Sequence, residues 1–139
     1  MRRGFLVALG AIVLGGCAGG GVQVPVGVQP QVLRIPDVYS GSLEIEGDRV
    51  PSTLHIHQEG AALTSRLTAS DFGMAAVGVG VLTGSEVELT MAYGAACTGI
   101  TTLVGRIADT TFRYTGRIIA SDCTGEVEGS FIFWPERSR

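Results

Sequence analysis

The chain has 139 residues and a formal net charge of −3, with 13 acidic and 10 basic side chains. This length suits one globular domain of modest size. The acidic balance argues against a nucleic-acid-binding protein, because contacts with phosphates require clustered cations.

The first residues have the layout of a secretory signal. Arg2 and Arg3 give a positive start, and an apolar run follows from Phe5 to Leu14. This run is about ten residues long, whereas a helix needs about 20 to cross a bilayer. We therefore expect residues 1–16 to be a cleaved signal peptide. Loss of its two arginines leaves a mature chain with a formal charge of −5.

The end of this signal, Leu14-Gly15-Gly16-Cys17, resembles the lipobox of bacterial lipoproteins. The resemblance implies cleavage before Cys17 and fatty-acyl chains such as palmitate on that cysteine, and several chains together anchor a protein firmly. Ala18, and not an aspartate, follows the cysteine, and in this respect the chain resembles members of the family that are sorted to the outer membrane. We therefore expect a lipid-anchored protein of the cell envelope that faces the periplasm. The alternative is an ordinary signal in which Cys17 is only a small apolar residue.

Residues 17–36 are predicted to be a flexible linker between the lipid anchor and the domain. Their glycines and prolines are typical of a tether. The segment also has a second interpretation, because Val22, Val24, Val26 and Val28 alternate as they would in a strand. Such a strand would add to the edge of a sheet, where Pro25 is tolerated.

From Asp37 onward, apolar and polar residues alternate with a period of two, and no amphipathic helix pattern occurs. Turn signals divide this region into eight candidate strands, at 38–46, 50–58, 62–70, 75–83, 86–93, 100–108, 111–120 and 126–134. Short connections make neighbouring strands antiparallel, and closure removes both exposed edges. Residues 37–139 are therefore predicted to form an all-β domain, an eight-stranded antiparallel up-and-down barrel.

Two of the turn signals predict a strand register. A two-residue turn at Asp109-Thr110 gives three inward-facing pairs, which are Ile107 with Phe112, Gly105 with Tyr114, and Leu103 with Gly116. In this register, Gly105 leaves room for the bulky ring of Tyr114. A two-residue turn at Gly47-Asp48 brings Glu46 to Arg49 on the outer face.

The same alternation turns ionisable residues outward. They are Glu44, Glu46, His55, His57, Arg66, Glu86, Glu88, Arg106, Arg113, Arg117, Glu126 and Glu128. A charge that faces lipid costs about 2–4 kcal/mol at mid-membrane. We therefore expect a soluble barrel rather than one that is inserted in a membrane.

One stripe departs from this pattern. If Gly84-Ser85 is a turn, then Leu82 faces Val87 on the inner side, and Val77, Val79 and Val81 point outward. Exposed β-branched residues in a row indicate a contact surface, either for a protein partner or for self-association. Two alternatives remain, namely that the N-terminal valine segment folds over the stripe or that a bulge reverses the face.

Two cysteines remain in the mature chain, Cys97 and Cys123. A disulfide is the default in an oxidising compartment, and the predicted hairpin around Asp109-Thr110 brings both residues to its open end. The alternative is a pair of reactive or metal-binding thiols, which no C-x-x-C spacing supports.

The sequence offers little that points to catalysis. His55 and His57 lie on one strand face, where they would bind a metal only with a third ligand, and a solvated polar face is the competing interpretation. No serine or cysteine is placed beside a base. We therefore predict no enzymatic activity, no metal and no cofactor.

An eight-stranded barrel encloses a space that side chains just fill or that holds one small ligand. In a hollow barrel, a small apolar ligand would be oriented by polar inner side chains, namely Tyr39, Ser52, Gln58, Ser65, Tyr93 and Tyr114. A filled core is the competing interpretation.

In size and strand number the domain resembles the calycin-type barrels, which include lipocalins and avidins, and the small periplasmic barrels that inhibit lysozyme or secreted metalloproteases. Architecture alone does not establish function. The leading hypothesis is a non-catalytic lipoprotein with a binding or structural role exerted through the barrel surface or loops. The alternatives are a carrier of a small apolar ligand and an inhibitor of an envelope-directed hydrolase.

Overall fold

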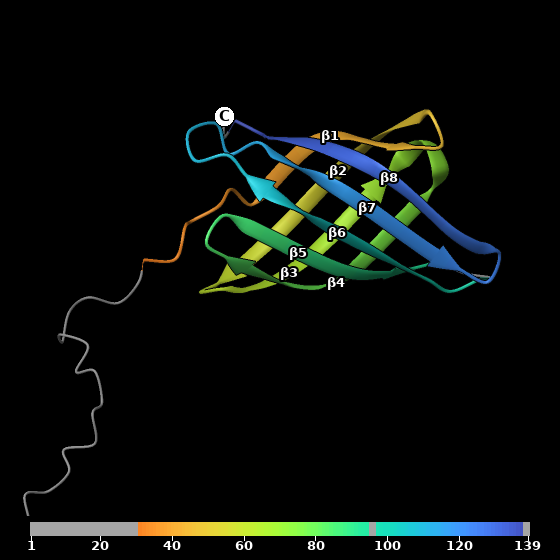
Figure 1. Ribbon diagram of the computed structural model, residues 1–139, viewed down its shortest axis with the longest axis horizontal. Helices are drawn as coiled ribbons and strands as arrows, with labels where there is room; N and C mark the ends of the chain where they lie inside the picture. Colours follow the sequence, from red (N-terminus) through yellow and green to blue (C-terminus); the bar gives the residue numbers. More distant parts are fainter. Residues whose placement is uncertain (1–30, 95–96, 138–139) are drawn as a thin grey trace, which may run out of the picture. The chain divides into compact units, whose positions relative to one another are not determined.

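The computed structural model describes residues 31–94 and 97–137 (Figure 1). The strands are β1 (Val38–Ile45), β2 (Asp48–Glu59), β3 (Ala62–Ala69), β4 (Met74–Thr83), β5 (Glu86–Tyr93), β6 (Gly99–Ile107), β7 (Tyr114–Asp122) and β8 (Gly125–Pro135). A short 3-10 helix, η1 (Ser70–Phe72), separates β3 from β4. The predicted signal peptide, the lipidation site Cys17 and the valine segment 22–28 lie outside the described residues.

The strands form a closed antiparallel barrel in which each strand pairs with the next and β8 pairs with β1. In Figure 1, β6, β7 and β8 cross obliquely over β1 and β2, with the interior between them. The all-β fold and the eight-stranded barrel predicted from the two-residue period are both confirmed. The described part of the chain contains no helix long and apolar enough to cross a membrane.

The β4–β5 hairpin has the register predicted from its Gly84-Ser85 turn, with Leu82 opposite Val87. The β1–β2 hairpin does not. Its turn is Glu46-Gly47, so Glu44 rather than Glu46 pairs with Arg49. Both turn residues have a positive φ, 53° for Glu46 and 85° for Gly47. This is the pattern of a type I′ turn, whose twist matches that of the flanking strands.

The predicted β6–β7 register is also wrong by two residues. Ile107 pairs with Tyr114, and Gly105 pairs with Gly116. The turn is longer than the predicted Asp109-Thr110 pair, because the Ala108 amide bonds to the Arg113 carbonyl and the Phe112 amide to the Ala108 carbonyl. A shift by an even number of residues keeps every side chain on its face. The inward sorting therefore survives, except for Phe112, which lies in the loop.

Glycines on the inner face let the strands approach one another closely. A Cβ built on Gly78 would collide with the Thr90 carbonyl oxygen and lie 2.6 Å from the Met91 Cα. At Gly105, an added Cβ would collide with the Thr115 carbonyl oxygen and would also lie 2.9 Å from Cζ of the Phe131 ring. The predicted role of Gly105 in making room for an aromatic ring therefore holds, but the ring belongs to Phe131 and not to Tyr114.

The barrel interior is packed. Inner side chains from most strands have no accessible surface, among them Tyr39, Leu43, Leu54, Leu67, Leu89, Leu103, Tyr114 and Phe133. A void large enough for a water molecule would leave the side chains around it accessible. No such void therefore lies between these residues. Aromatic rings fill much of the space, with the ring centroids of Tyr114 and Phe131 4.6 Å apart.

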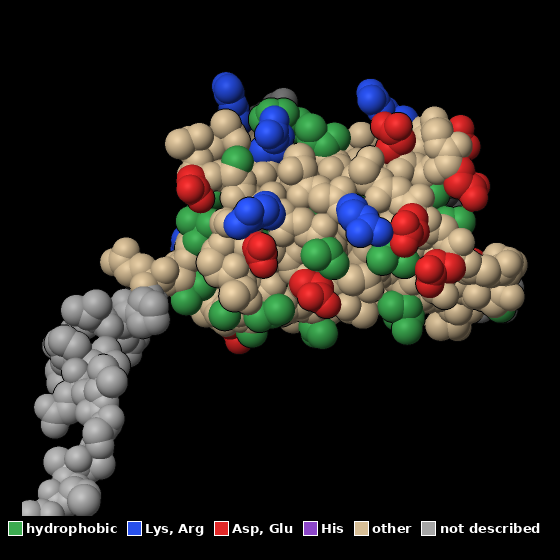
Figure 2. Space-filling view, in the orientation of Figure 1, with side chains coloured by type: hydrophobic (Ala, Val, Ile, Leu, Met, Phe, Trp, Pro, Cys, Tyr) green, Lys and Arg blue, Asp and Glu red, His purple; other side chains and the backbone are tan. Residues whose placement is uncertain are grey.

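The outer surface carries the charged side chains of the strands. Every ionisable residue that the alternation turned outward is exposed. Figure 2 shows arginine and acidic side chains interspersed over the face that carries β5 to β8. Two ion pairs on this surface are Arg106–Glu86 at 3.8 Å and Arg117–Glu128 at 3.3 Å. Exposed pairs of this kind contribute about 0–1 kcal/mol each, so they add little to the stability of the barrel.

Candidate functional site

The outer side of β4 carries a row of exposed aliphatic side chains. Val77, Val79 and Val81 are 57 %, 63 % and 46 % exposed, and their inward neighbours Ala76 and Leu82 are buried. The row points outward as predicted, and the alternative in which a bulge reverses the face is excluded by the regular β4–β5 pairing.

Two further aliphatic residues lie on β6, two strands away. Ile100 is 54 % and Val104 is 47 % exposed. The pairing puts them in the same cross-strand rows as the valines, because Val77 faces Ala92, which faces Ile100, and Val81 faces Glu88, which faces Val104. We name the five side chains Val77, Val79, Val81, Ile100 and Val104 the aliphatic face. The two β6 residues were not predicted from the sequence, although they alternate with the inward Thr101 and Leu103.

The aliphatic face has a defined relief. Strands lie about 4.8 Å apart and same-face residues repeat about every 6.7 Å, so its three rows on three strands cover about 290 Å². The large side chains are on β4 and β6, whereas β5 between them carries Ala92 and Thr90 in two of the three rows. Because a barrel is convex, small residues on the central strand and large ones beside it flatten the surface. Glu88 is the one ionisable residue in these rows.

The histidine pair does not form a metal centre among the described residues. His55 pairs across the sheet with Arg66, whose positive charge opposes a cation. His57 instead approaches Glu59, with 3.3 Å between its Nε2 and the Glu59 Oε1. No group of three His, Cys, Asp or Glu side chains able to hold a metal occurs in the described residues.

Several inner polar residues that were candidates for orienting a ligand are used by the fold itself. The Tyr114 hydroxyl donates to the Val87 carbonyl at 3.1 Å, and the Ser52 hydroxyl donates to the Val50 carbonyl at 3.1 Å. The hydroxyls of Tyr39 and Ser65 are buried and have no partner among the described residues. Burial raises the pKa of Tyr39 and the pKa of Tyr114 above their ordinary value.

Gln58 holds a segment of chain over one end of the barrel, the end at which β1 begins and β8 finishes. Its amide Nε2 donates to the Leu33 carbonyl at 2.8 Å, and its Oε1 accepts from the Ile35 amide at 3.0 Å. Ile35 is consequently buried against the core. We name residues 32–36 the strap. The barrel unit therefore includes part of the segment predicted to be a flexible linker.

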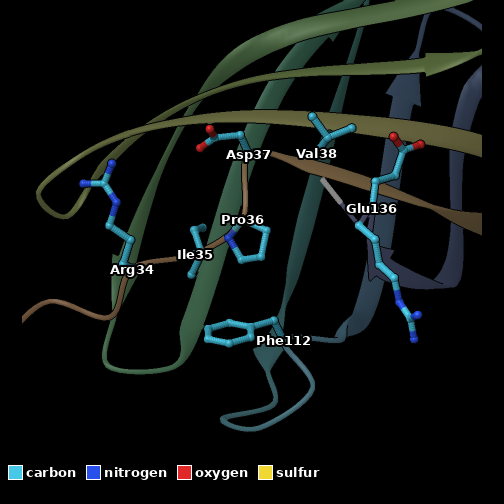
Figure 3. Close-up of a pocket in the computed structure, with 8 residues that line it drawn as sticks. Arg34, Ile35, Pro36, Asp37, Val38, Phe112 and Glu136 are labelled. Atoms are coloured by element: carbon cyan, nitrogen blue, oxygen red, sulfur yellow. The ribbon is translucent and has the colours of Figure 1, made fainter. Parts of the chain in front are cut away.

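An open groove of about 670 Å³ runs beside the strap. In Figure 3, Phe112 lies below Ile35 and Pro36, and the carboxylates of Asp37 and Glu136 point away from them. Phe112 has a φ of 55°, which is uncommon for a bulky residue, and it packs against the core. Its position closes this end of the barrel, and the groove carries charges of both signs, so it favours no one class of ligand.

Cys97 and Cys123 lie at disulfide distance, with their Cα atoms 5.9 Å apart. They join the β5–β6 connection to the β7–β8 turn at the end of the barrel opposite the strap. The juxtaposition predicted from the hairpin is thus present. On the outer surface, Arg113 lies over the ring of Trp134, with 5.3 Å from its guanidinium carbon to the ring centroid.

Comparison with known proteins adds no relative. No protein-family model, no curated protein and no solved structure matches this chain significantly. Function must therefore be inferred from the residues described above. Among these features, the aliphatic face is the one that the stability of the barrel explains least.

Proposed function

We propose that this chain is a non-catalytic lipoprotein of the bacterial cell envelope, anchored through Cys17 and acting as a binding module through the outside of its barrel. The observation that carries the proposal is the aliphatic face, whose most exposed side chain, Val79, is 63 % exposed. A contiguous exposed apolar patch of a few hundred Å² is often functional. The address rests on the lipobox-like residues Leu14 to Cys17.

The packed interior favours an outer binding surface over internal carriage of a ligand. Tyr39, Leu89 and Phe133 are among the inner side chains without accessible surface. A ligand of drug size needs a pocket of about 300–1,000 Å³, so a carrier role would require the barrel to repack. Inhibition of an envelope-directed hydrolase stays the second candidate.

The anchor is tested by metabolic labelling with a radioactive palmitate in a bacterial host. We expect the wild-type chain to incorporate label and to fractionate with the outer membrane. Cys17→Ser should abolish both, because the thioether needs that sulfur. Incorporation that persists in Cys17→Ser would contradict the anchor.

The binding role is tested by photocrosslinking in intact cells, with a photoreactive amino acid at position 79 and, as the matched control, at position 130. Ser130 is also outward and exposed, on β8. We expect a discrete crosslinked species from position 79 alone. Identical products from both positions, or none from position 79, would overturn the proposal. Addition of lysozyme or a secreted metalloprotease to the purified protein tests the inhibitor.

A further inference from the structure

The relief of the aliphatic face matches the shape of a helix. Its aliphatic side chains stand along β4 and along β6, which lie about 10 Å apart. An α-helix with its side chains is about 10–12 Å wide. The strand between β4 and β6 carries the smaller Ala92 and Thr90. A helix that lies along β5 would therefore rest on the branched side chains of both β4 and β6 at once.

The area of the face argues against a second copy of this chain as the occupant. A stable dimer buries about 800 Å² on each partner, whereas the aliphatic face covers about 290 Å². Two convex barrels would gain little more by contact at their rims. A helix of about ten residues spans roughly 15 Å, which is close to the 13 Å from Val77 to Val81 along the strand.

Charges at the two ends of the face give the helix a direction. Glu88 lies on β5 in the row of Val81, and Arg66 lies on β3 beside Val77 in the row at the other end. Arg117, on β7 beside Val104, also lies in the row of Glu88, but its charge is paired with Glu128. Neither Glu88 nor Arg66 takes part in an ion pair within the described residues. A helix carries partial positive charge at its N-terminus and partial negative charge at its C-terminus. Its N-terminus therefore fits beside Glu88 and its C-terminus beside Arg66.

From this fit we infer that the aliphatic face is a docking site for the apolar side of an amphipathic helix of another protein, aligned with β5. The inference rests on the proposed function and deepens it by naming the class of partner. Apolar residues at i, i+3, i+4 and i+7 of the helix would contact the aliphatic side chains of β4 and β6. The small area predicts a weak and reversible complex.

The test uses the full-length lipidated protein in nanodiscs and a fluorescent synthetic helix with leucines at that spacing. Fluorescence anisotropy should show saturable binding, which Val79→Glu weakens more than about tenfold and Ser130→Glu leaves unchanged. Glu88→Gln and Arg66→Gln should each weaken it about two- to fivefold, since each removes a charge that faces a helix end. The melting temperature of every variant identifies loss of folding.

Several results would overturn the inference. A peptide of the same composition without the apolar stripe should not bind, and equal binding of that peptide counts against a helix site. So does an absence of binding at about 1 mM peptide. If the protein dimerises in sedimentation and Val79→Glu prevents it, the occupant is a second copy of the chain. If the peptide binds only after residues 22–28 are deleted, the occupant is that segment. If the helix fails while the crosslink from position 79 persists, the proposed function stands and only the class of partner is wrong.

Discussion

Two tyrosines that meet inside the barrel differ in their hydrogen bonds. The rings of Tyr39 and Tyr114 lie 6.5 Å apart at their centroids. The Tyr114 hydroxyl donates to the Val87 carbonyl, whereas the Tyr39 hydroxyl has no partner in the described part of the chain. A buried hydroxyl without a partner costs free energy that a paired one recovers. The two residues therefore form a matched pair for measurement.

We expect Tyr114→Phe to lower the free energy of unfolding by about 1–2 kcal/mol, and Tyr39→Phe to leave it unchanged or raise it slightly. Urea denaturation followed by circular dichroism measures both. Equal losses in the two variants would mean that Tyr39 has a partner after all.

At Gly78, the fold leaves no room for a side chain. We expect Gly78→Ala to destabilise the barrel by about 1–3 kcal/mol, because the added Cβ meets the Thr90 carbonyl and the Met91 backbone. Val79→Ala on the same strand is the control and should stay within about 0.5 kcal/mol, since it faces outward. Thermal unfolding compares them, and a neutral Gly78→Ala would show that β4 and β5 can separate freely.

At the scale of elements, the strap depends on one side chain. Gln58 both donates to Leu33 and accepts from Ile35, because its amide carries a donor nitrogen and an acceptor oxygen. We expect Gln58→Ala to speed hydrogen exchange at the Ile35 amide. Gln58→Glu retains the acceptor for Ile35 but loses the donor to Leu33, so it should keep part of that protection. Exchange that is equally slow in all three proteins would show that burial of Ile35 alone holds the strap.

The other end of the barrel depends on the two cysteines. Cys97 and Cys123 are separated by 26 positions, and closing a loop of that size typically stabilises a protein by about 3 kcal/mol. We expect the double variant Cys97→Ser, Cys123→Ser to lose about this much stability in urea. Dithiothreitol should destabilise the wild type by a similar amount and leave the double variant unaffected. A wild type insensitive to the reductant would contradict the bond.

For the whole molecule, burial of tyrosines predicts a loss of stability at high pH. The pKa of a tyrosine in the unfolded chain is about 10, and burial raises the pKa of Tyr39 and of Tyr114 in the folded barrel. Above about pH 10 the unfolded chain releases these protons first, so the free energy of unfolding falls as pH rises; below that pH these groups contribute no pH dependence. Absorbance at 295 nm should show their ionisation only together with unfolding by circular dichroism. Reversible ionisation of both within a native barrel would disprove their burial.

Much of the barrel was predictable because its side-chain period is local. The strands were placed within a few residues, and Leu82 and Val87 were paired correctly, since Gly84 readily adopts the positive φ of 61° that a two-residue hairpin turn requires. The turns at Glu46-Gly47 and at 108–113 were placed or sized wrongly. The conformations that decided them, with positive φ at Glu46 and at Phe112, arise from non-glycine residues that carry no turn signal.

The candidate site was predictable in part. Val77, Val79 and Val81 were visible because three β-branched residues alternate with small ones on a single strand. Their grouping with Ile100 and Val104 was not, because it depends on the register of β4, β5 and β6 together. The strap escaped prediction for a similar reason, since nothing near Ile35 in the sequence indicates the amide of Gln58.

The sequence by itself determined which face of each strand is apolar and that neighbouring strands pair antiparallel, because side-chain alternation and short turns are local properties of the chain. Tertiary structure alone decided that the interior is packed, that Phe112 and Ile35 close one end, and that exposed aliphatic residues from separate strands share one surface. These properties arise from contacts between segments distant in the chain, and such contacts leave no periodic mark on either segment.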